Sequence, residues 1–166
     1  MSSPTRDTML LRTPFHSRVE AACALNDWGN WMGYTTPNAY FDVELEYFAI
    51  RSTTGVFDLS PMNKYQISGP DAEAYLSRLV TRDVTKIGIN RVGYAIWCND
   101  AGQVLDDGTI FRFSDNEFRL CSYQRADDWR AWNSPGFDVP TEPESASGAG
   151  LAVQGPTSCT VLTLLG

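Results

Sequence analysis

The stretch from Val92 to Phe113 constrains the fold more than any other part of the chain. Its pattern predicts two strands, over Val92–Cys98 and Val104–Phe113, joined by a tight turn. The turn segment Asn99–Gly102 has the residue types of a short hairpin connection, in which Gly102 can adopt a positive φ without a steric penalty. The sequence therefore predicts an antiparallel hairpin around which the remaining elements are organised.

Alternation along the second strand divides its side chains between two faces. Asp107 falls in the more apolar row, together with Leu105 and Phe111, whereas Asp106 falls in the opposite row. We therefore expect Asp107 to face inward. A carboxylate in such surroundings has to be paired, hydrogen-bonded or used in chemistry. The alternative is that Asp107 lies at a frayed strand start and is solvated.

Length and composition narrow the class of protein. The 166 residues suffice for one ordinary domain with a core, and 43% hydrophobic residues exclude disorder for most of the chain. A formal net charge of -7 without a basic run argues against a nucleic-acid partner. No apolar stretch approaches the roughly 18 residues of a membrane helix, and the N-terminus lacks the apolar segment of a secretory signal. These features predict a cytoplasmic protein without a membrane partner.

Cysteine and histidine content bears on metal and redox chemistry. Cys23, Cys98, Cys121 and Cys159 are widely separated, which favours reduced thiols over disulfides or a zinc site. The single histidine, His16, excludes a multi-histidine metal cage. We predict no metal site, and we expect His16 to lie partly exposed at the start of a helix.

Apolar periodicity and breaker residues predict the other elements along the chain. They are a flexible leader over residues 1–12, a helix over Phe15–Asn26, a loop-rich aromatic segment over Trp28–Tyr40, a helix over Val43–Arg51, a strand from Val56, a strand over Tyr65–Ser68, a helix over Asp71–Val80, the hairpin, a strand over Glu117–Ser122 and a helix over Gln124–Asn133. From Tyr65 onward the order is strand, helix, three strands and helix. That order is typical of an antiparallel sheet with helices on one face, an α+β fold.

The C-terminal part contains a linker and a repeat. Residues 134–150 are rich in Pro, Gly, Ser and acidic side chains and are predicted to be a linker. Leu151–Gly166 then repeats the design of Tyr65–Val80, a strand followed by Gly-Pro and a helix, with Leu162 in the place of Leu76. This second strand–helix repeat ends at Gly166 without further strands. We therefore expect a truncated chain in which Leu162 and Leu165 are exposed.

Six motifs, in the same order, resemble the folate-binding domain of the glycine cleavage T-proteins, the aminomethyltransferases. The resemblance extends from Thr13 to the end of the chain. The motifs here are Gly33-Tyr34 to Tyr40, Ala49-Ile50-Arg51, Gly55-Val56-Phe57-Asp58-Leu59-Ser60-Pro61-Met62, Ser68-Gly69-Pro70-Asp71-Ala72, Thr81-Arg82-Asp83-Val84, and the run GQVLDDGTI that ends at Ile110.

The resemblance implies the N-terminal part of a three-lobed, α+β folate-binding fold, with residues 13–133 as the folate-binding domain and 151–166 as the start of a truncated second repeat. It implies tetrahydrofolate as cofactor and Asp107 as the catalytic carboxylate, beside the folate nitrogens that accept the carbon. Met62, Tyr94 and Phe111 match positions that line the same pocket. Pro61 stands where the family has a histidine, so any role of that histidine is absent.

The implied function is tetrahydrofolate-dependent one-carbon transfer from a small-molecule donor. A true T-protein would also use a lipoyl carrier protein. Departures such as Gly108, where the family usually has Leu, look more like the demethylase branch, which takes methyl groups from methoxy-aromatics or methylated sulfur compounds. The alternatives are a non-catalytic folate-binding or regulatory module of the same fold, and an inactive fragment.

Overall fold

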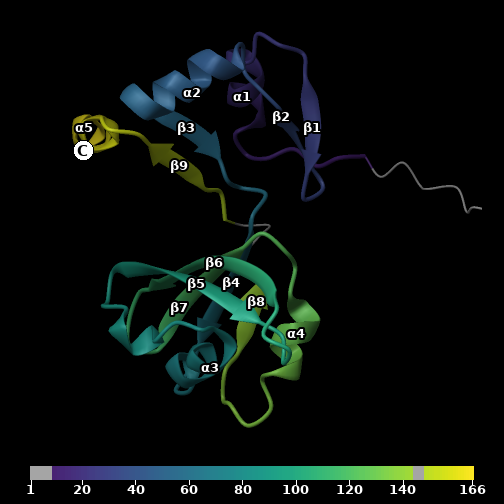
Figure 1. The fold of residues 1–166 in the computed structure, drawn as a ribbon, viewed down its shortest axis with the longest axis vertical. Helices are drawn as coiled ribbons and strands as arrows, with labels where there is room; N and C mark the ends of the chain where they lie inside the picture. Colours follow the sequence, from purple (N-terminus) through teal and green to yellow (C-terminus); the bar gives the residue numbers. More distant parts are fainter. Residues whose placement is uncertain (1–8, 144–147) are drawn as a thin grey trace, which may run out of the picture. The chain divides into compact units, whose positions relative to one another are not determined.

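The computed structural model describes residues 9–143 and 148–166, and contacts divide the chain into two compact units. Unit 1 comprises the residues up to Pro61 together with Ala149–Gly166, and unit 2 comprises Met62–Gly148. The predicted division was different, with one continuous domain over residues 13–133. The difference arises because strand β9 (Leu151–Gln154) pairs antiparallel with β3 (Gly55–Asp58), which returns the C-terminal segment to unit 1 (Figure 1).

Unit 2 is built on a five-stranded sheet whose ladders are antiparallel. The strand order is β5-β6-β7-β4-β8. The bounds are β4 Asn63–Ser68, α3 Ala72–Leu79, the short 3₁₀ helix η1 Val84–Lys86, β5 Arg91–Cys98, β6 Val104–Arg112, β7 Glu117–Ser122, α4 Asp127–Trp132 and β8 Thr141–Pro143. The predicted order of strand, helix, three strands and helix is confirmed, and the fold is α+β. Strand β8 was not predicted, because it lies in the segment interpreted as a linker.

The core of unit 2 lies between one face of this sheet and helix α3 (Figure 1). Alternate strand residues point into it, as the period of two requires. Its largest buried side chains include Trp97, Tyr65, Tyr75, Phe118 and Leu76. Trp129 of α4 stacks on Trp97, with ring centroids 5.8 Å apart, so α4 extends the cover over the same face. Trp132, the second tryptophan of α4, is 85% exposed and adds nothing to the core.

The predicted hairpin is confirmed as β5 and β6, which pair from Arg91↔Arg112 to Trp97↔Asp106 before a shift in register. The turn has the expected chemistry. The Asn99 side-chain oxygen accepts hydrogen bonds from the backbone N–H groups of Ala101 and Gln103, each at 3.0 Å. Gly102 has φ of +76°, which a residue with a Cβ would adopt only at a cost. These bonds fix where the two strands begin and end.

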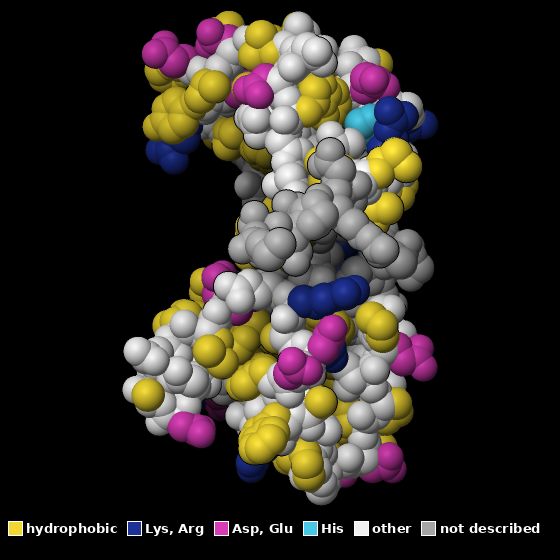
Figure 2. Space-filling view, turned by 90° about the vertical axis from the view of Figure 1, so that its right-hand side faces the viewer, with side chains coloured by type: hydrophobic (Ala, Val, Ile, Leu, Met, Phe, Trp, Pro, Cys, Tyr) yellow, Lys and Arg dark blue, Asp and Glu magenta, His cyan; other side chains and the backbone are white. Residues whose placement is uncertain are grey.

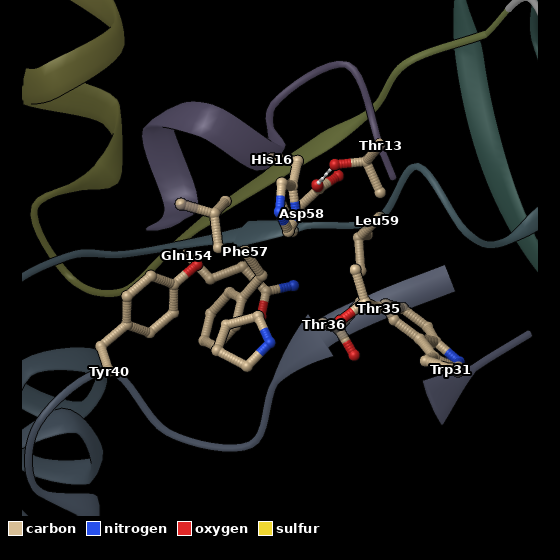
Figure 3. Close-up of a pocket in the computed structure, with 13 residues that line it drawn as sticks. Thr13, His16, Trp31, Thr35, Thr36, Tyr40, Phe57, Asp58, Leu59 and Gln154 are labelled. Atoms are coloured by element: carbon tan, nitrogen blue, oxygen red, sulfur yellow. Dashed lines mark hydrogen bonds between the residues drawn. The ribbon is translucent and has the colours of Figure 1, made fainter. Parts of the chain in front are cut away.

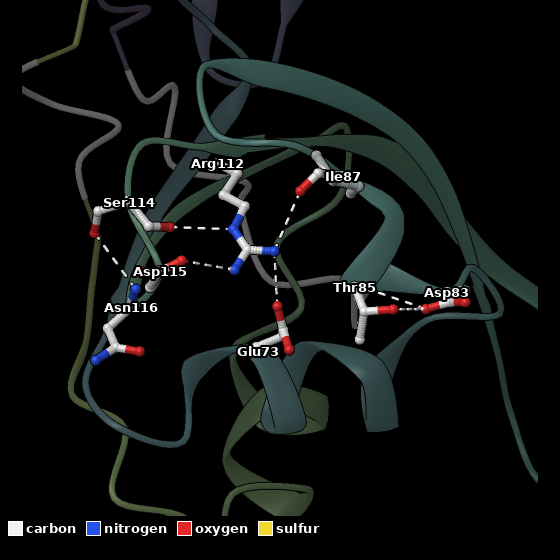
Figure 4. Close-up of polar contacts among 8 residues, drawn as sticks. All are labelled: Glu73, Asp83, Thr85, Ile87, Arg112, Ser114, Asp115 and Asn116. Carbon is white, nitrogen blue, oxygen red and sulfur yellow. Dashed lines mark hydrogen bonds and ion pairs between the residues drawn. The ribbon is translucent and has the colours of Figure 1, made fainter.

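Arg112, at the end of β6, ties the sheet to its surroundings (Figure 4). Its guanidinium group forms an ion pair with Glu73 of α3 at 2.7 Å and donates hydrogen bonds to the backbone oxygens of Ile87 and Ser114, each at 3.2 Å. The Arg112 side chain is only 11% exposed, so solvent screens the ion pair less than it screens a surface pair. The position of β6 is therefore fixed from both sides of the strand.

Unit 1 consists of short elements with few buried apolar side chains. Its elements are α1 His16–Ala22, β1 Trp28–Trp31, β2 Tyr34–Pro37, α2 Val43–Ser52, β3, β9 and α5 Ser158–Leu165. The loop-rich interpretation of Trp28–Tyr40 was wrong, since β1 and β2 form an antiparallel hairpin. Its turn residues Met32 and Gly33 have φ of 56° and 85°, the left-handed pair that closes a two-residue hairpin.

The predictions for the two ends of the chain can be tested to different extents. Most of the predicted leader, residues 1–8, lies outside the described residues, but Leu11 forms a bridge with Tyr34 and so is ordered. At the other end the predicted strand and helix are present as β9 and α5. Leu162 is 54% exposed and Leu165 80% exposed, as expected. Figure 2 shows apolar side chains at the surface in the upper part of the picture, which is unit 1. None of the described helices is long and apolar enough to cross a membrane.

Candidate functional site

The face of the unit 2 sheet that points away from α3 carries the predicted site residues. On β5 and β6 this face presents Tyr94, Ile96, Asp107, Thr109 and Phe111, all of them exposed or half-buried. The partners that face the core on the same strands are Ala95, Trp97, Gly108 and Ile110, all of them buried. One face of the hairpin is therefore packed, and the other presents a mixture of aromatic, aliphatic and acidic side chains.

The predicted inward orientation of Asp107 was wrong: Asp107 is exposed, and its neighbour Asp106 is 9% exposed. The reason is the residue that follows. Gly108 lies against the backbone of β7, where a Cβ would stand 2.0 Å from the carbonyl oxygen of Cys121 and 3.3 Å from Trp97. Only a glycine permits this close approach, so the row that looked less apolar is the one that packs against the core.

Asp107 is held by Tyr94 across the hairpin. The Tyr94 hydroxyl donates a hydrogen bond of 2.9 Å to Oδ2 of Asp107. The two residues are diagonal neighbours, since Tyr94 pairs with Thr109 and Ile96 pairs with Asp107. This hydrogen bond to the carboxylate, more than the partial desolvation, raises the pKa of Tyr94 above its ordinary value. The hydroxyl donates to the carboxylate and thereby orients it.

Phe111 and Met62 complete the set of predicted site residues. Phe111 is half-buried on the same face as Asp107, and its ring stacks on that of Phe113 with centroids 6.4 Å apart. Met62 precedes β4, which β7 separates from β6 in the sheet, and its backbone oxygen accepts a hydrogen bond of 3.0 Å from Lys64 Nζ. The structure thus brings Tyr94, Asp107 and Phe111 to one hairpin face. Met62 lies two strands away along the sheet.

Asp106 has a structural environment of its own. Its Oδ2 accepts a hydrogen bond of 2.8 Å from the backbone N–H of Gln124, which fixes the segment between β7 and α4. Asp106 also lines a cavity of about 390 Å³ beside the stacked rings of Trp97 and Trp129. The adjacent carboxylates therefore differ in function: one supports the fold, and the other is presented to solvent.

The metal-ligating residue types of the described part of the chain are scattered. Within residues 9–143 and 148–166, no group of three or more His, Cys, Asp and Glu side chains is arranged to hold a metal ion. The four cysteines are all free thiols. The open face presents a carboxylate fixed by a tyrosine hydroxyl, with apolar surface beside them.

Comparison with known proteins identifies the family to which this arrangement belongs. The family model described as the GCVT N-terminal domain matches residues 15–166. An aminomethyltransferase of Desulfitobacterium hafniense is 36% identical over 163 residues, which cover 95% of this chain and 44% of the relative. An aminomethyltransferase of Lysinibacillus sphaericus is 31% identical over 161 residues, 94% of this chain and 43% of the relative.

A solved structure shows the same fold. The glycine cleavage system aminomethyltransferase T from Bartonella henselae superposes with a TM-score of 0.81 at 26% identity, over 93% of this chain and 43% of that chain. The chain thus spans less than half the length of the relatives that it matches. The matched family model, which covers most of the chain, and the resemblance of its motifs agree. The chain belongs to the glycine cleavage T-protein family, as its GCVT N-terminal domain.

Proposed function

We propose that the protein takes part in tetrahydrofolate-dependent one-carbon transfer, with Asp107 as the catalytic carboxylate. The observation that carries the proposal is the hydrogen bond from Tyr94 to Asp107 on the open face of the β5–β6 hairpin. A carboxylate oriented in this way, in a member of an aminomethyltransferase family, is suited to stabilise positive charge that develops at a folate nitrogen.

The residues on this face fit a flat heteroaromatic ring with polar N–H groups. Tyr94, Ile96 and Phe111 offer aromatic and aliphatic surface for the ring, and the carboxylate of Asp107 accepts hydrogen bonds from its N–H groups. Tetrahydrofolate, when bound, would supply the nitrogens that accept the one-carbon unit. Met62, which precedes β4, lies two strands away from this face, so its contact with the ligand is a part of the proposal that rests on the family resemblance alone.

Two properties of the chain determine what Asp107 can contribute. The Tyr94 hydroxyl fixes one carboxylate oxygen and leaves the other free to face a ligand. The carboxylate is exposed in this chain, so its effect on a developing charge is screened by water until a ligand or another part of the protein covers it. Covering this face would strengthen the electrostatic contribution without moving either side chain.

The donor belongs to the proposal as well. The relatives that the chain resembles are aminomethyltransferases, which favours an aminomethyl donor carried on a lipoyl protein over a methoxy-aromatic or methylated sulfur compound. Gly108 does not bear on this choice, because the close approach of β7 accounts for it. We place the protein in the cytoplasm in this proposal.

The test is a donor screen with tetrahydrofolate. An aminomethyl-lipoyl carrier, a methoxybenzoate and dimethylsulfoniopropionate are supplied separately, and methylene- and methyl-tetrahydrofolate are followed. Asp107→Asn removes the charge but little volume, and we expect the transfer rate to fall about 10²–10³-fold. The matched control is Asp100→Asn, which removes one exposed charge in the hairpin turn and should leave the rate unchanged. Equal rates in Asp107→Asn and in the unchanged protein would refute the assignment.

A second candidate function is folate binding without transfer, and the exposure of Asp107 favours it. A carboxylate in contact with water stabilises a nearby charge weakly. Titration calorimetry with tetrahydrofolate separates the two functions. Binding without formation of either product, for every donor, supports the binding module, whereas product formation that depends on Asp107 supports the transferase.

A further inference from the structure

Unit 1 contains a cavity of about 310 Å³ that the proposed function does not use (Figure 3). All of its walls come from unit 1: α1, the β1–β2 hairpin, the paired strands β3 and β9, and residues that flank these elements. Its volume is at the lower end of the range for small-molecule sites, about 300–1,000 Å³. In Figure 3, Thr13, His16 and Asp58 lie on one side of the cavity, and Trp31, Thr35 and Thr36 of the hairpin lie on the other.

His16 is the first indication of a ligand. Its side chain was expected at the partly exposed start of a helix, but it is only 8% exposed. The ring packs on Trp28, with centroids 5.3 Å apart, and makes no hydrogen bond to another described residue. The ring nitrogens are not among the fully buried polar atoms that lack a partner, so they can be reached from the cavity. Since the ring lines the cavity, a ligand inside the cavity can bind to it.

Asp58 supplies the charge. Its Oδ2 accepts a hydrogen bond of 2.5 Å from the Thr13 hydroxyl, and its Oδ1 accepts one of 2.9 Å from the backbone N–H of Ser60. A carboxylate has about four acceptor positions, so these two bonds fix its orientation and leave capacity for a ligand. No lysine or arginine is among the residues that line the cavity, so its only permanent charge is negative.

The remaining walls suit a cation with a short apolar body. Trp31, Tyr40 and Phe57 line the cavity, and aromatic faces attract a positively charged nitrogen. Val19 and Leu59 add aliphatic surface for carbon atoms. The acceptors on Asp58 and His16 need a ligand with N–H donors, which a quaternary ammonium group lacks.

We propose that this cavity is a binding site for a small protonated primary or secondary amine. The ammonium group donates hydrogen bonds to the Asp58 carboxylate and to a ring nitrogen of His16, and its carbon chain lies against Trp31 and Tyr40. The site lies wholly within unit 1 and is independent of Asp107 and the proposed one-carbon transfer.

The experiment compares three ligands of similar size that differ in charge: butylammonium, 1-butanol and butyrate. Each is titrated into the uniformly ¹⁵N-labelled chain at constant ionic strength, with sodium chloride as the salt control. Butylammonium should give saturable shifts of the His16 ring signals and the Trp31 indole signal. The alcohol should bind about tenfold or more weakly, and butyrate should give no saturable shift.

Two variants distinguish the site from non-specific attraction to an acidic protein. Asp58→Asn should weaken butylammonium binding about tenfold to a hundredfold, because it removes a charge-assisted hydrogen bond, while the control Asp100→Asn should not change it. Trp31→Leu leaves the carboxylate in place and should weaken butylammonium and 1-butanol by a similar factor, because both ligands place their carbon chain against this wall. Equal loss of affinity in Asp58→Asn and Asp100→Asn, or equal binding of all three ligands, would overturn the proposal. So would butylammonium shifts no larger than those produced by the salt.

Discussion

The two units of the chain bury very different amounts of apolar surface. Nearly all of the buried apolar side chains belong to unit 2. Among the described residues of unit 1 other than proline, Ala39 alone is both apolar and buried. Unit 1 instead leaves large apolar side chains exposed on α2 and α5, including Phe48 at 59% and Leu164 at 83%. Since apolar burial is the main favourable term in folding, we expect unit 2 to be the more stable of the two.

One sequence pattern occurs in both units and shows what causes the difference. Strand β4, Gly69-Pro70 and α3 form it in unit 2, and β9, Gly155-Pro156 and α5 form it in unit 1. Both glycines adopt positive φ, +114° and +129°. Leu76 of α3 is nevertheless fully buried, while its counterpart Leu162 of α5 is 54% exposed. The local pattern thus specifies strand, turn and helix, and burial is determined by which other strands lie against the helix.

Replacing the two equivalent leucines with alanine should give the largest difference in stability loss between the two units. Leu76→Ala leaves a cavity under α3 and should lower the free energy of unfolding of unit 2 by about 2–5 kcal/mol. Leu162→Ala removes a largely exposed side chain and should cost about 0.5 kcal/mol or less. Amide hydrogen exchange of β4 and β9 measures each unit separately. Equal losses would mean that α5 is packed as α3 is.

Alanine at the two turn glycines should have a smaller effect that is similar in both units. A Cβ at Gly69 would lie 2.5 Å from the backbone oxygen of Asp138, and one at Gly155 would lie 2.3 Å from that of Thr53. Each substitution therefore adds a clash to a strained φ, and should cost on the order of 1–3 kcal/mol. Gly102→Ala is the control, because its φ is positive but the space around it is open.

That control should cost about 1 kcal/mol, the backbone strain alone. The same hydrogen-exchange measurement applies to all three variants. If Gly155→Ala were harmless while Gly69→Ala was costly, the turn in unit 1 would be able to relax, and the two copies would not share one local design.

The elements that the sequence predicted well are those whose signals are local. The hairpin turn at Asn99–Gly102 and the two Gly-Pro turns are signalled by their own residues, so all three were predicted correctly. The β1–β2 hairpin was missed because Trp28, Trp31 and Tyr34 obscure the alternation. The positive φ at Met32 is rare for a residue with a side chain, and only Gly33 signalled the turn.

Features that depend on distant contacts could not be predicted from the sequence. Strand β8 ends at Pro143 in an acidic segment, and only its pairing with Tyr65 and Ile67 of β4 makes it a strand. The side of β6 that packs against the core was predicted wrongly, because its two sets of alternate side chains have similar apolar content. The close approach of β7 at Gly108 determines which row packs, and that contact joins residues distant in the chain.

Replacing Asp106 and Asp107 one at a time tests which of the two side chains of β6 points toward the core. Asp106→Ala leaves the backbone N–H of Gln124 without its acceptor and should cost about 1 kcal/mol, since water in the adjoining cavity offsets part of the loss. Asp107→Ala should leave the stability of unit 2 nearly unchanged, because its side chain is exposed. Urea unfolding followed by the fluorescence of Trp97 and Trp129 measures both. A larger loss in Asp107→Ala would mean that Asp107 supports the fold.

The smallest expected effect compares one tyrosine from each unit. Tyr94 in unit 2 and Tyr40 in unit 1 both have a raised pKa, but for different leading reasons. The hydrogen bond to Asp107 is the main cause for Tyr94, and burial is the main cause for Tyr40, with the charge of Asp58 second. A raised pKa stabilises the folded state below the ordinary tyrosine pKa of about 10, and this contribution is lost as pH rises through the higher folded value.

Removal of the two carboxylates should therefore shift the two tyrosines unequally. Asp107→Ala should return the pKa of Tyr94 most of the way to its ordinary value, because it removes both the acceptor and the charge. Asp58→Ala should lower the pKa of Tyr40 less, since burial remains. Site-resolved ¹³C NMR of the tyrosine ring carbons, recorded from about pH 8 to 12 around that ordinary value, measures each hydroxyl separately. A Tyr94 pKa that Asp107→Ala leaves unchanged would show that the hydrogen bond across the hairpin does not hold in solution, and the carboxylate would then lack the orientation that one-carbon transfer requires.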